Sequence, residues 1–161
     1  MRIKKLFDKI EKSIMIILSI MLFIMVGAIF TQVIMRYVFN NANEWSEELA
    51  KYTFVWLTML GSAVAVRKCA HMKVDYFINL MPKKLVKVLN VITNALLILF
   101  FIVVIKYGFD LVGITFKQKS AGMGMPMAYP YLALPVGGIL MLMFTIESYF
   151  NKDENNVVEE G

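Results

Sequence analysis

Four long apolar segments constrain the fold of this chain more than any other feature of its sequence. They cover residues 13–36, 47–66, 86–108 and 129–150, and 59% of the 161 residues are hydrophobic, against roughly 45–50% in soluble domains. Crossing a bilayer core of about 30 Å takes roughly 20 helical residues. Because the runs do not alternate with polar residues, helices are favoured over barrel strands. We predict an all-α integral membrane protein with four transmembrane helices, bundled into a single membrane domain over residues 1–161.

Two shorter segments have the spacing of amphipathic helices that lie on a membrane surface. Residues 2–12 place apolar side chains three and four residues apart, with lysines on the opposite face. Residues 74–81 show a similar spacing and end at Pro82, which cannot continue a helix. We therefore expect short interfacial helices in addition to the spans. Pro135 is expected to bend the fourth span, and an acidic tail follows at 151–161.

The net charge of +5 is distributed as in a multi-pass membrane protein. Eleven basic residues precede the first span or lie between the second and third: Arg2, Lys4, Lys5, Lys9, Lys12, Arg67, Lys68, Lys73, Lys83, Lys84 and Lys87. Basic residues near span ends mark the cytoplasmic side. Both termini are therefore expected in the cytoplasm, with the loops at 37–50 and 109–128 outside. This arrangement predicts the lipid bilayer as a partner and argues against nucleic acid.

Neither an enzyme nor an autonomous carrier is favoured by the polar residues. His71 is the only histidine, which excludes haem between paired histidines and a metal site of several His and Cys residues, so no cofactor is expected. The span centres are uncharged. Lys106 lies near the outer end of the third span and Asp110 follows four residues later, and either a local ion pair or snorkelling to the headgroups explains both. A standalone multidrug-type exporter needs an intramembrane carboxylate. That exporter and a small membrane enzyme remain the alternatives to a membrane subunit that binds another protein.

An acidic cluster between the first two spans is the first candidate interface. Glu47 and Glu48 begin the second span, and Arg36 ends the first, across a short hairpin. Their similar depth predicts that Arg36 pairs with one of the two carboxylates. The alternative is a generic belt of basic and aromatic anchors, including Tyr37 and Trp45.

A second candidate lies at the other end of the second span. Arg67, His71 and Asp75 follow each other at four-residue spacing, so a continuous helix would bring them together as one polar ladder. We expect this ladder to have a structural role at the inner interface and not a catalytic one.

Several short patterns match a known family. They are Arg36-Tyr37-x-Phe39, Trp45-x-Glu47-Glu48, Trp56, Gly61, Ala65-x-Arg67, His71, Val74-Asp75, Gly124-x-Pro126, Tyr131 and Pro135-x-Gly137. Their order and spacing over residues 14–150 resemble the small membrane subunit (DctQ- or SiaQ-like) of tripartite ATP-independent periplasmic (TRAP) transporters. The residues that this resemblance and the charge pattern single out as interface candidates are Arg36, Tyr37, Trp45, Glu47, Glu48, Trp56, Gly61, Arg67, His71 and Asp75.

The resemblance implies a function and a set of partners. The small subunit would pair with a large, multi-helix, elevator-type permease subunit that holds the sodium and substrate sites. A soluble periplasmic protein would deliver an organic acid, of the sialic acid or dicarboxylate class, and sodium would drive its uptake. The small subunit would serve as a fixed scaffold without a substrate site of its own. Because the acidic tail ends at Gly161, a separate and not a fused subunit is expected.

Overall fold

The computed structural model describes residues 2–41, 43–71 and 83–159. Its helices are α1 (Arg2–Tyr37), α2 (Glu44–His71), α4 (Lys83–Thr115), α5 (Ala128–Tyr131) and α6 (Ala133–Glu159). Four stretches are long and apolar enough to cross a membrane, and the fourth combines α5 with the first part of α6. The all-α fold with four transmembrane helices is therefore confirmed.

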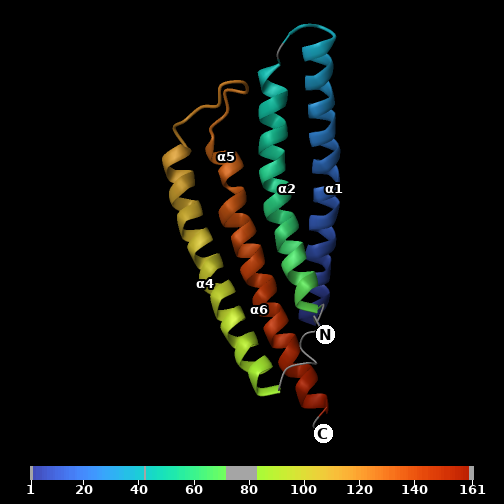
Figure 1. Cartoon of the computed structure of the whole chain (residues 1–161), viewed down its shortest axis with the longest axis vertical. Coiled ribbons are helices and arrows are strands. Elements are labelled where there is room, and N and C mark those ends of the chain that lie inside the picture. The colour runs from blue at the N-terminus through green and yellow to red at the C-terminus, as the bar shows by residue number, and fades with distance from the viewer. Residues whose placement is uncertain (1, 42, 72–82, 160–161) are drawn as a thin grey trace.

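The four long helices of the predicted bundle are arranged in a single row. α1 packs along α2, α2 along α6, and α6 along α4 (Figure 1). α1 and α4 thus end the row, each with one extensively packed long neighbour. In lipid, no hydrophobic effect drives apolar helices to close around a core, so close packing at selected contacts decides the arrangement. The end of α1, the start of α2 and the connection 116–127 lie at one end of the row, and the start of α1 and the end of α6 lie at the other.

Two glycines let α6 approach both of its neighbours closely. A Cβ on Gly137 would lie 2.8 Å from the Cβ of Met59 on α2, and a Cβ on Gly138 would lie 2.9 Å from Cγ1 of Ile105 on α4. Small residues at helix contacts are the usual means of close packing in membranes. Below this contact, the buried core of the row surrounds Phe144, which is 1% exposed.

The N-terminal segment differs from the prediction. Residues 2–12 are not a separate interfacial helix but the first turns of α1, which runs without a break to Tyr37. The reason is packing, because the apolar face of this segment covers the row: the Phe7 and Phe144 rings lie 6.1 Å apart. The second amphipathic segment, 74–81, lies outside the described residues.

The fourth span contains Pro135 near the point where α5 and α6 meet. Pro135 has no N–H, so the carbonyl of Tyr131, four residues earlier, has no helical donor. The two helices α5 and α6 meet at Leu132, which keeps helical dihedral angles (φ −57°, ψ −22°). Its N–H donates to the Ala128 carbonyl at 2.9 Å, and its carbonyl accepts from the Val136 N–H at 3.2 Å. The chain therefore continues in helical geometry past this point, and the bend expected at Pro135 stays a prediction.

α4 extends past the predicted end at residue 108 and stops at Thr115. Lys106 therefore lies inside the helix and not near its outer end, as the sequence suggested. No ion pair joins it to Asp110 among the residues described; its Nζ lies 5.7 Å from the centre of the Tyr107 ring.

Candidate functional site

Polar side chains gather at the two ends of the row. At the end that holds the termini, Arg67 of α2 is bound by three carboxylates. Its Nε and Nη2 donate to Glu147 of α6 at 2.8 and 2.9 Å, and Nη2 also donates to Asp8 of α1 at 2.7 Å. Its Nη1 donates to Glu11 of α1. We call Arg67, Asp8, Glu11 and Glu147 the terminus-side cluster.

The terminus-side cluster fixes three helices relative to one another. Arg67 is only 3% exposed and Glu147 6%, and the Arg67 guanidinium carbon also lies 5.5 Å from the centre of the Phe144 ring. Removing one partner of such a buried pair typically costs about 3–5 kcal/mol, because the other charge is left without compensation. All three guanidinium nitrogens face carboxylates, so this arginine has no free donor edge for an anionic substrate. Its geometry indicates a structural role.

At the opposite end, Glu48 holds the connection between α4 and α5 against the start of α2. Its carboxylate oxygens accept hydrogen bonds from the backbone N–H groups of Gly122 and Met123, both at 2.9 Å. A Cβ on Gly122 would lie 2.8 Å from the carbonyl carbon of Glu44. Glycine is therefore required for this close approach. We call Glu48, Gly122, Met123 and Glu44 the loop-side cluster.

Two further contacts involve residues predicted from the sequence. The Trp56 indole N–H donates to the Tyr129 carbonyl at 3.2 Å, which ties α2 to α5. Glu47 accepts from Lys51 at 2.6 Å and from Gln32 of α1 at 3.1 Å.

The predicted ion pair of Arg36 with Glu47 or Glu48 is not formed among the described residues, and this expectation was wrong. Lys51 lies one turn after Glu47 on the same helix, where pairing needs no ordering of a second segment. Glu48 is occupied by the loop. Arg36 remains exposed, as do Tyr37 at 78% and Trp45 at 46%.

The remaining predicted residues are only partly described. A Cβ on Gly61 would meet nothing within 4 Å, so this glycine is not needed for packing within the chain. His71 is the last residue of α2, and its side chain lies outside the description. Asp75 also lies outside the described residues, so the predicted ladder with Arg67 stays a prediction.

Sequence analysis missed the carboxylates that bind Arg67. Asp8 and Glu11 are the acidic residues that precede the first span, and they lie three apart on one helical face. Glu147 lies at the corresponding end of the fourth span. A buried arginine requires carboxylate partners. The position of these three carboxylates, at the same end of their spans as Arg67, was the signal in the sequence that could have identified them.

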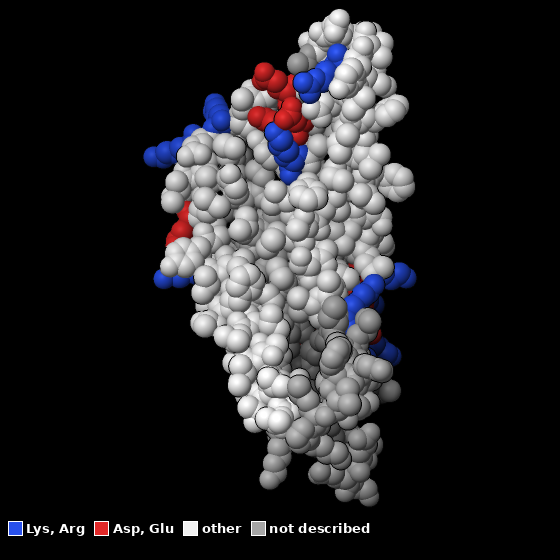
Figure 2. Space-filling view, viewed as in Figure 1, with Lys and Arg blue, Asp and Glu red and all other residues white. Residues whose placement is uncertain are grey.

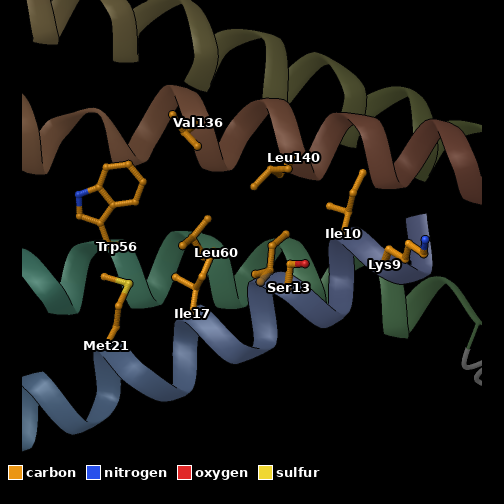
Figure 3. A pocket seen from close by; sticks show the side chains of 10 residues that line it. Lys9, Ile10, Ser13, Ile17, Met21, Trp56, Leu60, Val136 and Leu140 are labelled. Carbon is orange, nitrogen blue, oxygen red and sulfur yellow. The ribbon is translucent and has the colours of Figure 1, made fainter. Parts of the chain in front are cut away.

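A groove of about 580 Å³ runs between α1 and α6, with α2 as its floor (Figure 3). Ile17, Met21 and Leu60 are typical of its lining, while Lys9 and Ser13 form its one polar end. Binding a carboxylate or a sodium ion here would leave most of the ion without polar partners, at a high desolvation cost. The groove suits hydrocarbon. Among the described side chains, no group of three or more His, Cys, Asp or Glu residues is arranged to hold a metal ion.

Comparison with known proteins identifies the family. The family described as tripartite ATP-independent periplasmic transporters, DctQ component, matches residues 25–155. The chain belongs to this family. As a DctQ component with four spanning helices, it is a membrane transporter subunit.

Individual relatives agree with this assignment. The chain is 36% identical over 126 residues to the sialic acid TRAP transporter permease protein SiaT of Haemophilus influenzae, covering 76% of this chain but only 20% of SiaT. It is 29% identical over 150 residues to the sialic acid TRAP transporter small permease protein SiaQ of Vibrio cholerae, covering 91% of this chain and 86% of SiaQ. The C4-dicarboxylate TRAP transporter small permease protein DctQ of Vibrio cholerae is 33% identical over 76 residues, which are 47% of this chain and 33% of that protein.

Proposed function

We propose that this chain is the small permease subunit of a sodium-coupled, binding-protein-dependent transporter for an organic acid of the sialic acid or dicarboxylate class. It would be a fixed scaffold in a bacterial inner membrane, with both termini in the cytoplasm. The large elevator-type subunit would hold the substrate and sodium, and a periplasmic protein would deliver the substrate. The chain itself would carry no substrate site and catalyse no reaction.

The single observation that carries this proposal is the row of helices fixed at both ends. The terminus-side cluster joins α1, α2 and α6, and the loop-side cluster joins the start of α2 to the connection after α4. A flat row exposes far more helix surface to its surroundings than a closed bundle does. Such a rigid wall fits a support against which a larger subunit moves.

The relatives support the choice of partner and substrate class. SiaT, which the chain matches over only a fifth of its length, is named a permease protein, whereas SiaQ is named a small permease protein. This difference fits a small unit that works together with a larger one. The buried cation at Arg67 supports the absence of a substrate site at the terminus-side cluster, because carboxylates already bind it.

Reconstitution tests the proposal directly. Liposomes would contain this chain alone, the large subunit alone, or both. The periplasmic protein and the labelled substrate would be added to the outside solution, under an inward sodium gradient. We expect uptake only with both membrane subunits and only with the gradient. Sodium-driven uptake by this chain alone would disprove the scaffold role, and uptake by the large subunit alone at the full rate would show that no scaffold is needed.

A further inference from the structure

The outer face of α4 carries a regular stripe of side chains that point away from α6. The stripe residues alternate at spacings of four and three, the pattern of a helix seam that packs against another helix. They are Ile92, Leu96, Leu99, Val103, Lys106, Asp110 and Gly113. We call these seven residues the α4 stripe.

Nothing in the described chain covers the α4 stripe. Leu96 is 61% exposed and Leu99 59%, and Lys106 and Asp110 are exposed as well. A Cβ on Gly113 would meet nothing within 4 Å. Figure 2 shows charged atoms over α4 at the edge of the molecule, apart from those gathered at the end with the loops.

The contacts of α6 give the depth of Lys106 in the row. Ile105 touches Gly138 on α6, and the preceding residue, Gly137, touches Met59 on α2. Lys106 therefore lies level with Met59. Since helix contacts run across the row, residues joined in this way lie at nearly the same depth.

Met59 lies near the middle of the membrane-spanning part of α2. It follows Glu48 by 11 residues and precedes Arg67 by 8, which is about 16 and 12 Å along a helix. The distance from Glu48 to Arg67 is thus about 28 Å, close to the thickness of a hydrocarbon core of about 30 Å. Lys106 is accordingly at mid-membrane depth, and Asp110 lies one turn nearer the loops.

An exposed cation at mid-membrane depth, with an exposed anion one turn away, is unfavourable on a face covered by lipid. Charged side chains within spans almost always face other protein or water, and lysine snorkels to headgroups only near helix ends. Lys106 lies nine residues before Thr115, the end of α4. A stripe that alternates apolar residues with a cation and an anion therefore needs a protein partner with complementary charge.

We propose that the α4 stripe is the docking surface for a transmembrane helix of the large permease subunit, which presents an acidic side chain to Lys106 and a basic one to Asp110. This inference rests on the proposed function, because it names the surface through which the scaffold binds its partner. A membrane-spanning helix is the occupant that satisfies its own backbone hydrogen bonds at this depth, and Gly113 allows its backbone to approach closely. The α4 stripe thus places the partner at the α4 end of the row and leaves α1 to lipid.

Site-specific photocrosslinking in the intact complex tests the position of the surface. A benzophenone amino acid would replace Leu99 or Val103 in the stripe, with Phe23 on α1 as the control, because Phe23 is 79% exposed. We expect adducts with the large subunit from both stripe positions and none from Phe23. A complex that co-purifies but gives no more adduct from Leu99 and Val103 than from Phe23 overturns the stripe alone. Failure of the unsubstituted chain to co-purify with the large subunit overturns the proposed function and the stripe together.

Charge removal tests the role of Lys106. Lys106→Met should weaken co-purification of the large subunit by about 30-fold or more, the effect of leaving a buried partner charge unpaired. Lys117→Met removes an equal charge from the exposed loop after α4 and should leave co-purification unchanged. Because Lys106 is exposed in the single chain, both variants should fold alike and melt at the same temperature alone. Equal co-purification of the two variants would contradict the proposal.

Discussion

Replacing Arg67 with methionine should be the most damaging single change at the terminus-side cluster. Methionine keeps much of the volume of the side chain and removes its charge. The substitution leaves the carboxylate of Glu147, whose side chain is 3% exposed, without the cation that it binds in the structure. Asp8, with a side chain 57% exposed, remains accessible to solvent after the change.

The magnitudes follow from the burial of each partner. Loss of Arg67 should cost about 3–5 kcal/mol, the range for breaking a buried pair from one side. Asp8→Asn removes only an exposed contact and should cost about 1 kcal/mol or less. Glu147→Gln should fall between these values, because Arg67 then still binds Asp8 and Glu11. At roughly 2–4 °C per kcal/mol for a chain of this size, Arg67→Met should lower the melting temperature by at least about 6–12 °C.

The melting temperature can be read from the intrinsic fluorescence of the two tryptophans in mild detergent. A double variant, Arg67→Met with Glu147→Gln, supplies the control, since it removes both buried charges. It should melt above Arg67→Met alone, because no buried carboxylate is then left without a cation. The reasoning fails if Asp8→Asn is as damaging as Arg67→Met, or if the double variant is less stable than either single one.

Three further predictions concern packing, the loop contact and orientation. Gly122→Ala should cost about 1–3 kcal/mol in melting experiments, because the added Cβ would lie 2.8 Å from backbone; Gly61→Ala, with open space around it, should instead raise stability by about 0.5–1 kcal/mol. Glu48→Gln should speed hydrogen exchange at the two loop amides that the carboxylate binds, and unchanged exchange would refute their protection by this residue. In a Cys69→Ser background, Asn41→Cys should react with a membrane-impermeant thiol reagent from outside the cell; labelling only from inside would reverse the proposed orientation.

The sequence supported some predictions well and others poorly, for identifiable reasons. Long apolar runs indicate directly which segments can lie in a membrane, so the prediction of four spanning helices was correct, while the helices extend beyond some of the predicted ends. α4 continues to Thr115 because helix geometry does not stop where hydropathy falls. The pairing of Arg36 failed for a different reason. Proximity along a hairpin suggested Glu47, but Lys51 on the same helix binds that carboxylate.

The terminus-side cluster shows what was within reach of sequence reasoning. Arg67 was singled out, and its structural role was expected. The partners proposed for it came from the same helix, because four-residue spacing is visible in a sequence. Its observed partners come from α1 and α6, separated from it by 56 or more residues. Contacts between helices cannot be read from spacing within one of them.

The sequence by itself determined that this is a membrane protein, that it has four helices able to span the membrane, and which family it resembles. Those properties depend on the composition of single segments and on short patterns within them. Only the tertiary structure decided that the helices form a row, that Arg67 joins three of them, and that Lys106 lies level with Met59 on a face that the described chain leaves exposed. In lipid, all apolar helix faces are nearly equivalent. The choice of neighbours therefore falls to a few glycines and charged groups, whose mutual placement exists only in three dimensions.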